Sequence, residues 1–197
     1  MANKSASESA ATRQRIVETA RRLFAAKGFA ATTTREIVQS EGLTEGAFFH
    51  HFKDKKALFA TVVESVQREF AAEVFKRGSA GSNAFERFVF GAKASLELSQ
   101  KPEYLRLVLI EAPTALGGDE WRRIDSAASL SVIEPALAAI AKKRDIPPQQ
   151  LRPMALQVLG LLNETAFALS RDNKTVTVDD VIAELSATIS DWIRRLG

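Results

Sequence analysis

Apolar residues recur at spacings of three and four along most of this 197-residue chain, and this period constrains its fold more than any other feature. Residues three or four apart fall on one face of an α-helix, whereas a β-strand needs strict alternation. Only residues 175–178 alternate, and that run is too short to form a significant strand. The sequence therefore predicts an all-α protein of about nine helices.

Capping and breaking residues bound the predicted helices. Thr12 is a candidate N-cap, and Gly28 is a candidate stop because glycine tolerates left-handed backbone geometry. Pro135 is expected to kink or split the helix that contains it. Residues 1–11 have no apolar stripe and are predicted to be a disordered tail. The expected helices are 12–27, 35–41, 45–51, 54–76, 84–100, 103–115, 119–143, 148–171 and 178–196.

The composition excludes several kinds of site. The chain has no cysteine, which rules out disulfides, iron–sulfur clusters and thiolate zinc sites. Its two histidines, His50 and His51, are adjacent and would point about 100° apart on a helix, so a shared metal is disfavoured and no cofactor is expected. No run reaches the ~18 apolar residues of a membrane span, and residues 1–11 lack the apolar stretch of a signal peptide. A cytoplasmic location is expected.

Basic charge is concentrated in the first part of the chain. Residues 1–57 contain ten basic and six acidic residues, a formal charge of +4, whereas residues 58–197 carry a formal charge of −1. This asymmetry fits a polyanion-binding module attached to a near-neutral body. A solvated basic face would produce the same charge, so charge alone does not decide between the two.

Residues 33–52 contain two short helical segments separated by a tight turn at Gly42. This is the anatomy of a helix-turn-helix, in which the first helix braces against the duplex and the second enters the major groove. The second segment is too short for an ordinary core helix, and Phe48 is its inward residue. Lys53 and Lys55 follow it directly, where they would reach phosphates. The segment therefore predicts DNA binding.

The run from Thr12 to Glu64 resembles the N-terminal DNA-binding domain of the tetracycline-repressor (TetR) family. Order and spacing agree across three helices and two turns rather than at one short motif. The matching residues are Ile16, Ala20, Leu23, Phe24, Lys27, Gly28, Phe29, Thr33, Thr34, Arg35, Ile37, Gly42, Leu43, Thr44, Gly46, Phe48, His50, His51, Phe52 and Lys55. The rest of the chain is similar to the family in layout, and residues 111–125 resemble a C-terminal domain found in one branch of it.

The resemblance implies a role for each position of the helix-turn-helix. Arg35 would bond a guanine or a phosphate, and Lys55 would clamp the DNA backbone. Two positions depart from the family pattern, because Glu45 stands where a basic or neutral residue is frequent and Phe49 where tyrosine is usual. Neither departure argues against DNA binding, but both make a borrowed operator sequence unsafe. The implied DNA contacts are Thr33, Thr34, Arg35, Thr44, Glu45, Gly46, Ala47, Phe49, His50, Lys53 and Lys55.

The last two predicted helices are the candidates for self-association. A two-fold operator requires a dimer because one short helix covers too few base pairs. The helix at 148–171 is apolar on more than one side, and Gly160 would allow a close helix crossing. An internal core would use the same residue types. The predicted interface residues are Leu156, Leu159, Gly160, Ala166, Phe167, Leu185, Ile189 and Trp192.

The middle helices carry the residues expected to bind an effector. An apolar or aromatic small molecule is the expected class because the walls of such a site would be apolar. Most of these residues would serve equally well in an ordinary core. The predicted ligand contacts are Phe70, Phe88, Leu96, Leu109, Glu111, Trp121, Asn163 and Phe167.

The sequence is therefore interpreted as a homodimeric transcriptional regulator, a repressor that binds palindromic operator DNA and is released by a small effector. It is divided into the tail at 1–11, a DNA-binding domain at 12–57 and an effector-binding and dimerisation domain at 58–197. A helical enzyme is the first alternative, but the chain has no Glu-x-x-His pair, P-loop or Gly-x-Ser-x-Gly motif. A protein-interaction module that has lost operator binding is the second, and Glu45 and Phe49 motivate it.

Overall fold

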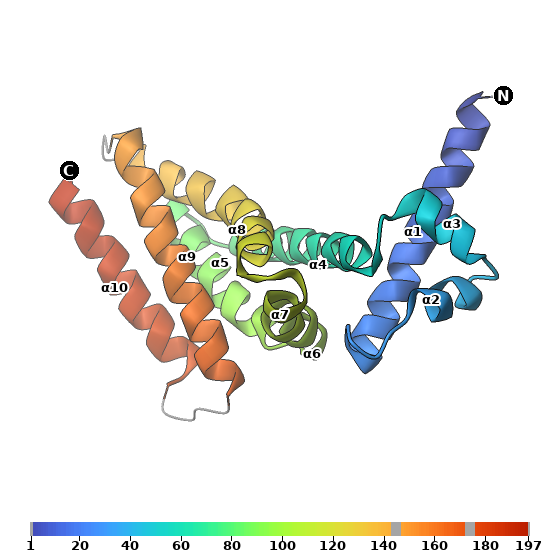
Figure 1. Ribbon diagram of the computed structural model, residues 1–197. Helices are drawn as coiled ribbons and strands as arrows, with labels where there is room; N and C mark the ends of the chain where they lie inside the picture. The colour runs from blue at the N-terminus through green and yellow to red at the C-terminus, as the bar shows by residue number, and fades with distance from the viewer. Residues whose placement is uncertain (1, 143–146, 172–175, 197) are drawn as a thin grey trace. The chain divides into compact units, whose positions relative to one another are not determined.

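The computed structural model describes residues 2–142, 147–171 and 176–196, and every regular element within them is a helix (Figure 1). The predicted all-α class is confirmed. The helices are α1 (Ala2–Lys27), α2 (Thr34–Ser40), α3 (Glu45–His51), α4 (Lys55–Gly78), α5 (Ala84–Ser99), α6 (Pro102–Tyr104), the π-helix η1 (Leu105–Glu111), α7 (Ala112–Leu116), α8 (Gly118–Ala141), α9 (Pro148–Ser170) and α10 (Val178–Leu196).

Three helix predictions differ from the structure. Helix α1 begins at Ala2 rather than at Thr12, because once a helix has formed each added residue costs little and alanine-rich sequence extends it. The helix predicted at 103–115 is three elements, α6, η1 and α7. Pro135 does not split α8, because proline removes only one backbone donor and the buried Ile133 and Leu137 hold the helix on both sides.

The chain forms two compact units, and their division differs from the predicted domain boundary at residue 57. Unit 1 comprises Met1–Val66 and Arg106–Arg122, and unit 2 comprises Gln67–Leu105 and Arg123–Gly197. The first half of α4 joins unit 1 because its apolar face completes the core of that unit. Leu58, Phe59 and Val62 are buried there with residues of α1, α2 and α3. The Phe59 ring lies edge-on to that of Phe24, with the ring centroids 5.0 Å apart.

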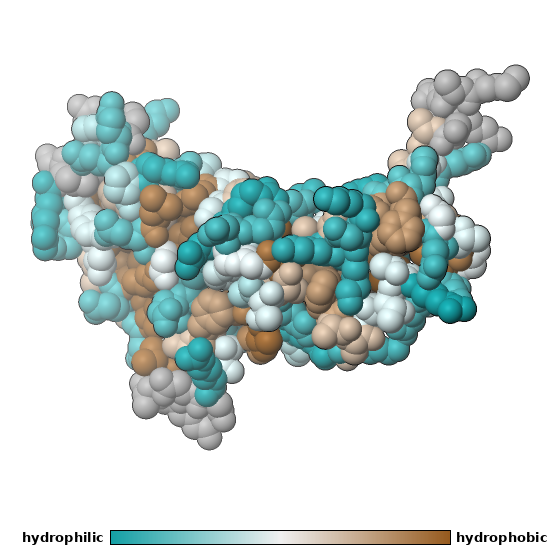
Figure 2. All heavy atoms as spheres, in the orientation of Figure 1, coloured by the Kyte–Doolittle hydropathy of each residue, from teal (hydrophilic) through white to brown (hydrophobic). Residues whose placement is uncertain are grey.

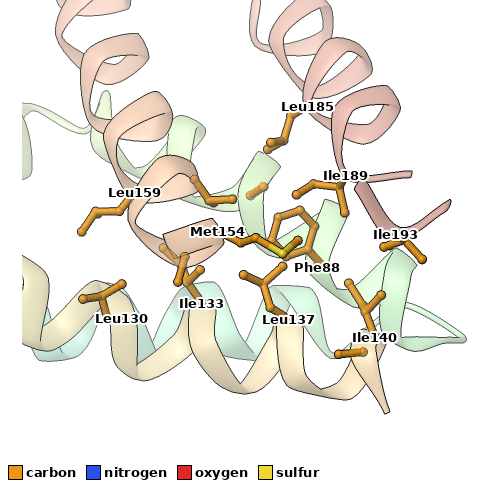
Figure 3. Close-up of a cluster of buried hydrophobic side chains, with 14 of the residues drawn as sticks. Phe88, Leu130, Ile133, Leu137, Ile140, Met154, Leu159, Leu185, Ile189 and Ile193 are labelled. Atoms are coloured by element: carbon orange, nitrogen blue, oxygen red, sulfur yellow. The ribbon is translucent and has the colours of Figure 1, made fainter. Parts of the chain in front are cut away.

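The core of unit 2 is built from α5, α8, α9 and α10 (Figure 3). The buried residues are Phe88, Ala92 and Leu96 from α5, five residues from α8, and residues from the facing sides of α9 and α10, including Met154 and Ile189. Helix α8 is the one helix of the described chain that is long and apolar enough to cross a membrane by length and composition alone. Here its apolar side chains, such as Leu137, belong to this core.

Candidate nucleic-acid interface

Two threonine caps and one glycine turn shape the helix-turn-helix. The hydroxyl of Thr33 accepts a hydrogen bond from the Glu36 N–H at 3.1 Å, so Thr33 is the N-cap of α2. The hydroxyl of Thr44 accepts from the Ala47 N–H at 3.3 Å and caps α3. Gly42 lies between the helices with φ +67°, a conformation that favours glycine. The predicted pair of short helices and their turn is confirmed.

The outer edge of α2 and α3 is exposed while the inner edge is buried. Ile37, Val38 and Phe48 face the core of unit 1. Phe49, the next residue of α3, is 61% exposed. Of the predicted DNA contacts, Thr34 and Ala47 are partly exposed and the following are exposed: Thr33, Arg35, Thr44, Glu45, Gly46, Phe49, His50 and Lys53.

Lys55 has a structural role that the sequence did not indicate. Its ammonium donates to the backbone carbonyl oxygens of Phe29 at 2.8 Å and Thr32 at 2.9 Å. It also lies 4.3 Å from the centroid of the Phe29 ring, within cation–π distance. Lys55 is half-buried against the loop between α1 and α2, and two of the three donors of its ammonium are used there. Lys53, by contrast, is exposed.

Glu41 joins α1 to the end of α2. Its carboxylate accepts from Arg15 Nε at 2.9 Å and from the Thr19 hydroxyl, and Arg15 Nη2 also donates to the Glu41 carbonyl oxygen at 3.0 Å. The Thr19 hydrogen bond, and then that from Arg15, lowers the pKa of Glu41 below its usual value. The carboxylate therefore stays ionised and braces α1 against α2. The sequence did not single out these residues, because their contacts join positions 22 to 26 apart.

The two histidines at the end of α3 have different surroundings. His50 is exposed, whereas His51 is partly buried, and its ring centroid lies 5.0 Å from that of His50. Burial, followed by the charges of His50 and Arg13, lowers the pKa of His51. Burial therefore favours the neutral form of the His51 imidazole, beside the exposed edge of α3. In the residues that the structure describes, no three metal-ligating side chains are grouped to hold an ion.

Comparison with known proteins identifies this geometry. Residues 16–62 match the family described as bacterial regulatory proteins, tetR family. Residues 85–191, more than half of the chain, match the tetracyclin repressor-like C-terminal domain. The chain belongs to the TetR family. Members of this family are DNA-binding transcriptional regulators rather than enzymes.

Individual TetR relatives match only part of the chain. The chain is 52% identical over 52 residues to the uncharacterized regulator YerO of Bacillus subtilis, which covers 26% of this chain and 18% of YerO. It is 40% identical over 72 residues to the repressor Rv1474c of Mycobacterium tuberculosis, covering 36% of this chain and 38% of that protein. The chain thus spans well under half the length of these curated relatives.

A solved TetR structure matches almost the whole chain. A TetR-family regulator from Pectobacterium atrosepticum superposes with a TM-score of 0.73 and 26% identity, covering 96% of each chain. The regulator FadR of Bacillus subtilis, solved in complex with stearoyl-CoA, has a TM-score of 0.63 and covers 91% of this chain and 96% of its own. At 15% identity that second likeness shows the fold alone.

The predicted effector contacts do not all fall in one unit of this TetR protein. Leu109, Glu111 and Trp121 belong to unit 1, and the other five belong to unit 2. Phe88 and Leu96 are buried in the core of unit 2. Phe70, Asn163 and Phe167 are partly buried in the same unit. Glu111 accepts a hydrogen bond from the Phe29 N–H at 3.0 Å, so it contacts the loop after α1.

Four polar side chains from α4, α6, α8 and α9 form a buried cluster in unit 2. The Asp125 carboxylate accepts from Gln67 Nε2 at 2.9 Å and from Asn163 Nδ2 at 2.7 Å. The Tyr104 hydroxyl donates to Gln67 Oε1 at 3.1 Å, and the Tyr104 ring stacks on that of Phe70 at 4.3 Å between centroids. Burial raises the pKa of Asp125, which is 4% exposed, and that of Tyr104. The sequence prediction included Asn163 and Phe70 but missed the other three.

The predicted dimer contacts are split between surface and core. Leu159, Ala166, Leu185 and Ile189 are buried within the protomer, so they cannot contact a partner without unfolding this core. That part of the prediction was wrong, because α9 is apolar on two sides and its period does not say which side faces inward. Leu156 and Gly160 are exposed, and Phe167 and Trp192 are partly exposed.

A shallow hollow lies at the ends of α9 and α10 in unit 2. It has a volume of ≈ 160 Å³ and is lined by Glu164, Thr165, Ala168, Leu169, Val176 and Val181. Sites for drug-sized ligands have volumes of roughly 300–1,000 Å³, so this hollow is too small for one.

Proposed function

We propose that this TetR-family protein is a homodimeric repressor that binds a palindromic operator and is released by a small-molecule effector. The observation that carries the proposal is the two-sided geometry of the short helix α3, where Phe48 is buried and Phe49 and His50 are exposed. The N-capped starts of α2 and α3 offer backbone N–H groups for phosphates. The protein would act in the cytoplasm, where its operator lies.

The exposed side chains divide into base-reading and phosphate-contacting groups. Arg35 would bond a guanine in bidentate fashion, and Glu45 would accept from a cytosine amino group. Phe49 would pack against a sugar or a thymine methyl group, which would also cover an apolar ring that is otherwise in water. Lys53 would contact a phosphate. Lys55 would stabilise the domain through its hydrogen bonds to the carbonyl oxygens of Phe29 and Thr32 in the loop between α1 and α2.

The partner in the proposed dimer would contact the exposed side of α9. Leu156 is 48% exposed, and Gly160, one turn further along the same side, has no atom within 4 Å of where a Cβ would lie. Leu161 adds further exposed apolar surface. Figure 2 shows apolar surface over α9 and α10. An exposed apolar stripe beside a glycine suits close packing of two helices, and two copies of α9 and α10 would form a four-helix interface.

The effector would bind in unit 2, beside the buried polar cluster. Phe70 and Tyr104 supply stacked aromatic surface there, and Asp125 supplies an acceptor whose partners are neutral groups, the amides of Gln67 and Asn163 and the Ser129 side chain. An aromatic or apolar molecule with a hydrogen-bond donor matches this combination. A site built from a few polar groups among apolar walls gives orientation as well as affinity.

Selection of bound sequences from random duplex DNA tests the proposed function. We expect a two-fold symmetric motif whose half-sites lie about 10–10.5 base pairs apart or a multiple of this, because a symmetric dimer reads the groove twice on one face. Enrichment of no motif would favour a protein-interaction module. An asymmetric motif bound by one chain would exclude the dimer while keeping DNA binding.

A further inference from the structure

The loop between α1 and α2 leads directly into the first helix of the helix-turn-helix and so sets the position where α2 begins. It runs from Gly28, which ends α1, to Thr33, which caps α2. Gly28 has φ +88°, and its N–H donates to the Phe24 carbonyl oxygen at 2.8 Å. The hydroxyl of the buried Thr32 donates back to the Gly28 carbonyl oxygen at 2.9 Å. A shift of this loop would therefore move the start of α2.

Two charged residues of η1 hold the same loop within unit 1. Glu111 Oε2 accepts from the Phe29 N–H at 3.0 Å, and Arg106 Nη1 donates to the Ala26 carbonyl oxygen at 3.0 Å. Arg106 Nε lies 3.7 Å from Glu111 Oε1, so the two side chains also form an ion pair. The arginine satisfies a carbonyl at the negative end of α1, and the carboxylate accepts a charge-assisted bond.

The fit of these residues to the loop is close. A Cβ on Gly28 would lie 2.3 Å from Glu111 Oε1 and 3.2 Å from Arg106 Nη2. Two features therefore require glycine at position 28. Its backbone is in the left-handed region, and the side chains of Glu111 and Arg106 leave no room for a Cβ. The side chains of η1 therefore lie directly against the backbone of the loop at Gly28.

The π-helix explains how Arg106 and Glu111 reach the loop together. Residues five apart would point about 140° apart around an α-helix, which has 3.6 residues per turn. The wider turn of a π-helix links residues five apart and brings them to one side. Pro113 accounts for the widening, because it has no N–H and its ring would clash with the carbonyl of Leu109 in an α-helix. π-Helical turns are rare in proteins, and those that occur frequently lie at functional sites.

We infer that Arg106 and Glu111 are positioning residues that clamp the loop between α1 and α2 and so fix the helix-turn-helix for operator binding. The inference rests on the proposed function. A dimer must present two reading helices at one separation, and a loose joint would have to be ordered on binding, at a cost in affinity. Neither residue belongs to the DNA-facing edge, so their effect on DNA binding is indirect.

The π-helix η1, which carries the clamp residues Arg106 and Glu111, begins at the last residue of a unit 2 segment, Leu105. Tyr104, of the buried polar cluster, immediately precedes η1 in the chain. The chain passes between the units after residues 66, 105 and 122, and each passage lies within three residues of Gln67, Tyr104 or Asp125. These three side chains are hydrogen-bonded in a row. Tyr104 of this row and Arg106 of the clamp are therefore only two residues apart in the chain.

The test compares Arg106→Ala, Glu111→Ala and the double variant of the full chain with two controls. Ile110→Ala changes a 59% exposed side chain of the same π-helix, and Arg122→Ala removes another exposed arginine of unit 1. The probes are the selected symmetric DNA and the same DNA with one base pair inserted between the half-sites. We expect the clamp variants to bind the selected DNA about tenfold more weakly, and to discriminate less against the lengthened DNA. The double variant should be little worse than either single one, because both residues hold one loop.

Amide hydrogen exchange gives a readout that does not depend on DNA. Glu111→Ala should speed exchange at the Phe29 amide, and Glu111→Gln should restore part of the protection because its amide oxygen still accepts. Unchanged exchange at Phe29, or clamp variants that bind and discriminate like the controls, would overturn the inference while leaving operator binding intact. If the wild-type protein prefers no symmetric DNA, the proposed function fails, and exchange at Phe29 still tests the clamp.

Discussion

Lys55 and Lys53 are two residues apart, and the structure predicts opposite consequences for their replacement by methionine. Lys55→Met removes two charge-assisted hydrogen bonds to the Phe29 and Thr32 carbonyl oxygens and a cation–π contact. Hydrogen bonds to charged groups contribute roughly 1.5–3 kcal/mol each. Because Lys55 is half-exposed and water can replace part of this, we expect Lys55→Met to lower the free energy of unfolding by about 2 kcal/mol. Lys53→Met should leave it within about 0.5 kcal/mol of wild type, since Lys53 is exposed.

Two assays separate the roles. Denaturant unfolding measures stability, and fluorescence anisotropy on the selected DNA at several salt concentrations gives the slope of log affinity against log salt. Each phosphate contact contributes about −0.9 to that slope per reading head. Lys53→Met should make the slope shallower by about that amount, whereas Lys55→Met should weaken binding with little change in slope. A Lys55→Met protein with wild-type stability and a shallower slope would refute the structural role derived for this lysine.

Three further perturbations follow from the same geometry. Arg35→Ala should cost about 1–3 kcal/mol on the selected DNA and relax preference at one base position, as measured by repeating the selection; equal losses on random DNA would contradict base reading. Leu156→Arg places a charge on the exposed apolar side of α9 and should shift the mass measured by light scattering toward the monomer; an unchanged dimer would place the interface elsewhere. The pKa of Glu41 is lowered in the folded state, so its contribution to stability is present above the unfolded pKa of about 4.3 and is lost as pH falls below that value. The free energy of unfolding of Glu41→Gln should therefore depend less on acid pH than that of wild type. An identical acid profile would contradict a stabilising role for the Glu41 carboxylate.

Local chemistry made the helix-turn-helix predictable from sequence. Thr33, Gly42 and Thr44 act within three or four residues of themselves, so their types and spacing already indicate caps and a turn. Gly28 likewise ends α1 as expected. Contacts between distant positions were not predictable in this way. The sequence predicts that Lys55 contacts DNA, but nothing in its neighbourhood indicates that its ammonium also binds the carbonyl oxygens 23 and 26 residues earlier.

The body of the protein shows a second limit. Helical period reveals that a face is apolar, but not whether it meets its own core or another chain. The period of α10 therefore predicts Leu185 and Ile189 at a dimer interface, whereas the structure buries them in the core formed by α5, α8, α9 and α10. Glu111 shows a similar limit, because an acidic residue among apolar ones suggests a ligand contact and gives no sign of a contact within the chain. Its partner is a backbone N–H 82 residues away, which only the folded chain brings near.

The central claim is that two chains read a symmetric operator through α3. Titration of the protein with the selected symmetric duplex, and separately with a duplex that carries one half-site, tests this claim most directly. The mass of the protein–DNA complex is measured at the same time, and we predict that two chains bind each symmetric duplex. The half-site duplex should bind much more weakly, because only one exposed edge of α3 contacts it. Replacing Phe49 with alanine should weaken binding to both duplexes. One chain per duplex, with equal affinity for the symmetric, half-site and scrambled DNA, would contradict the account.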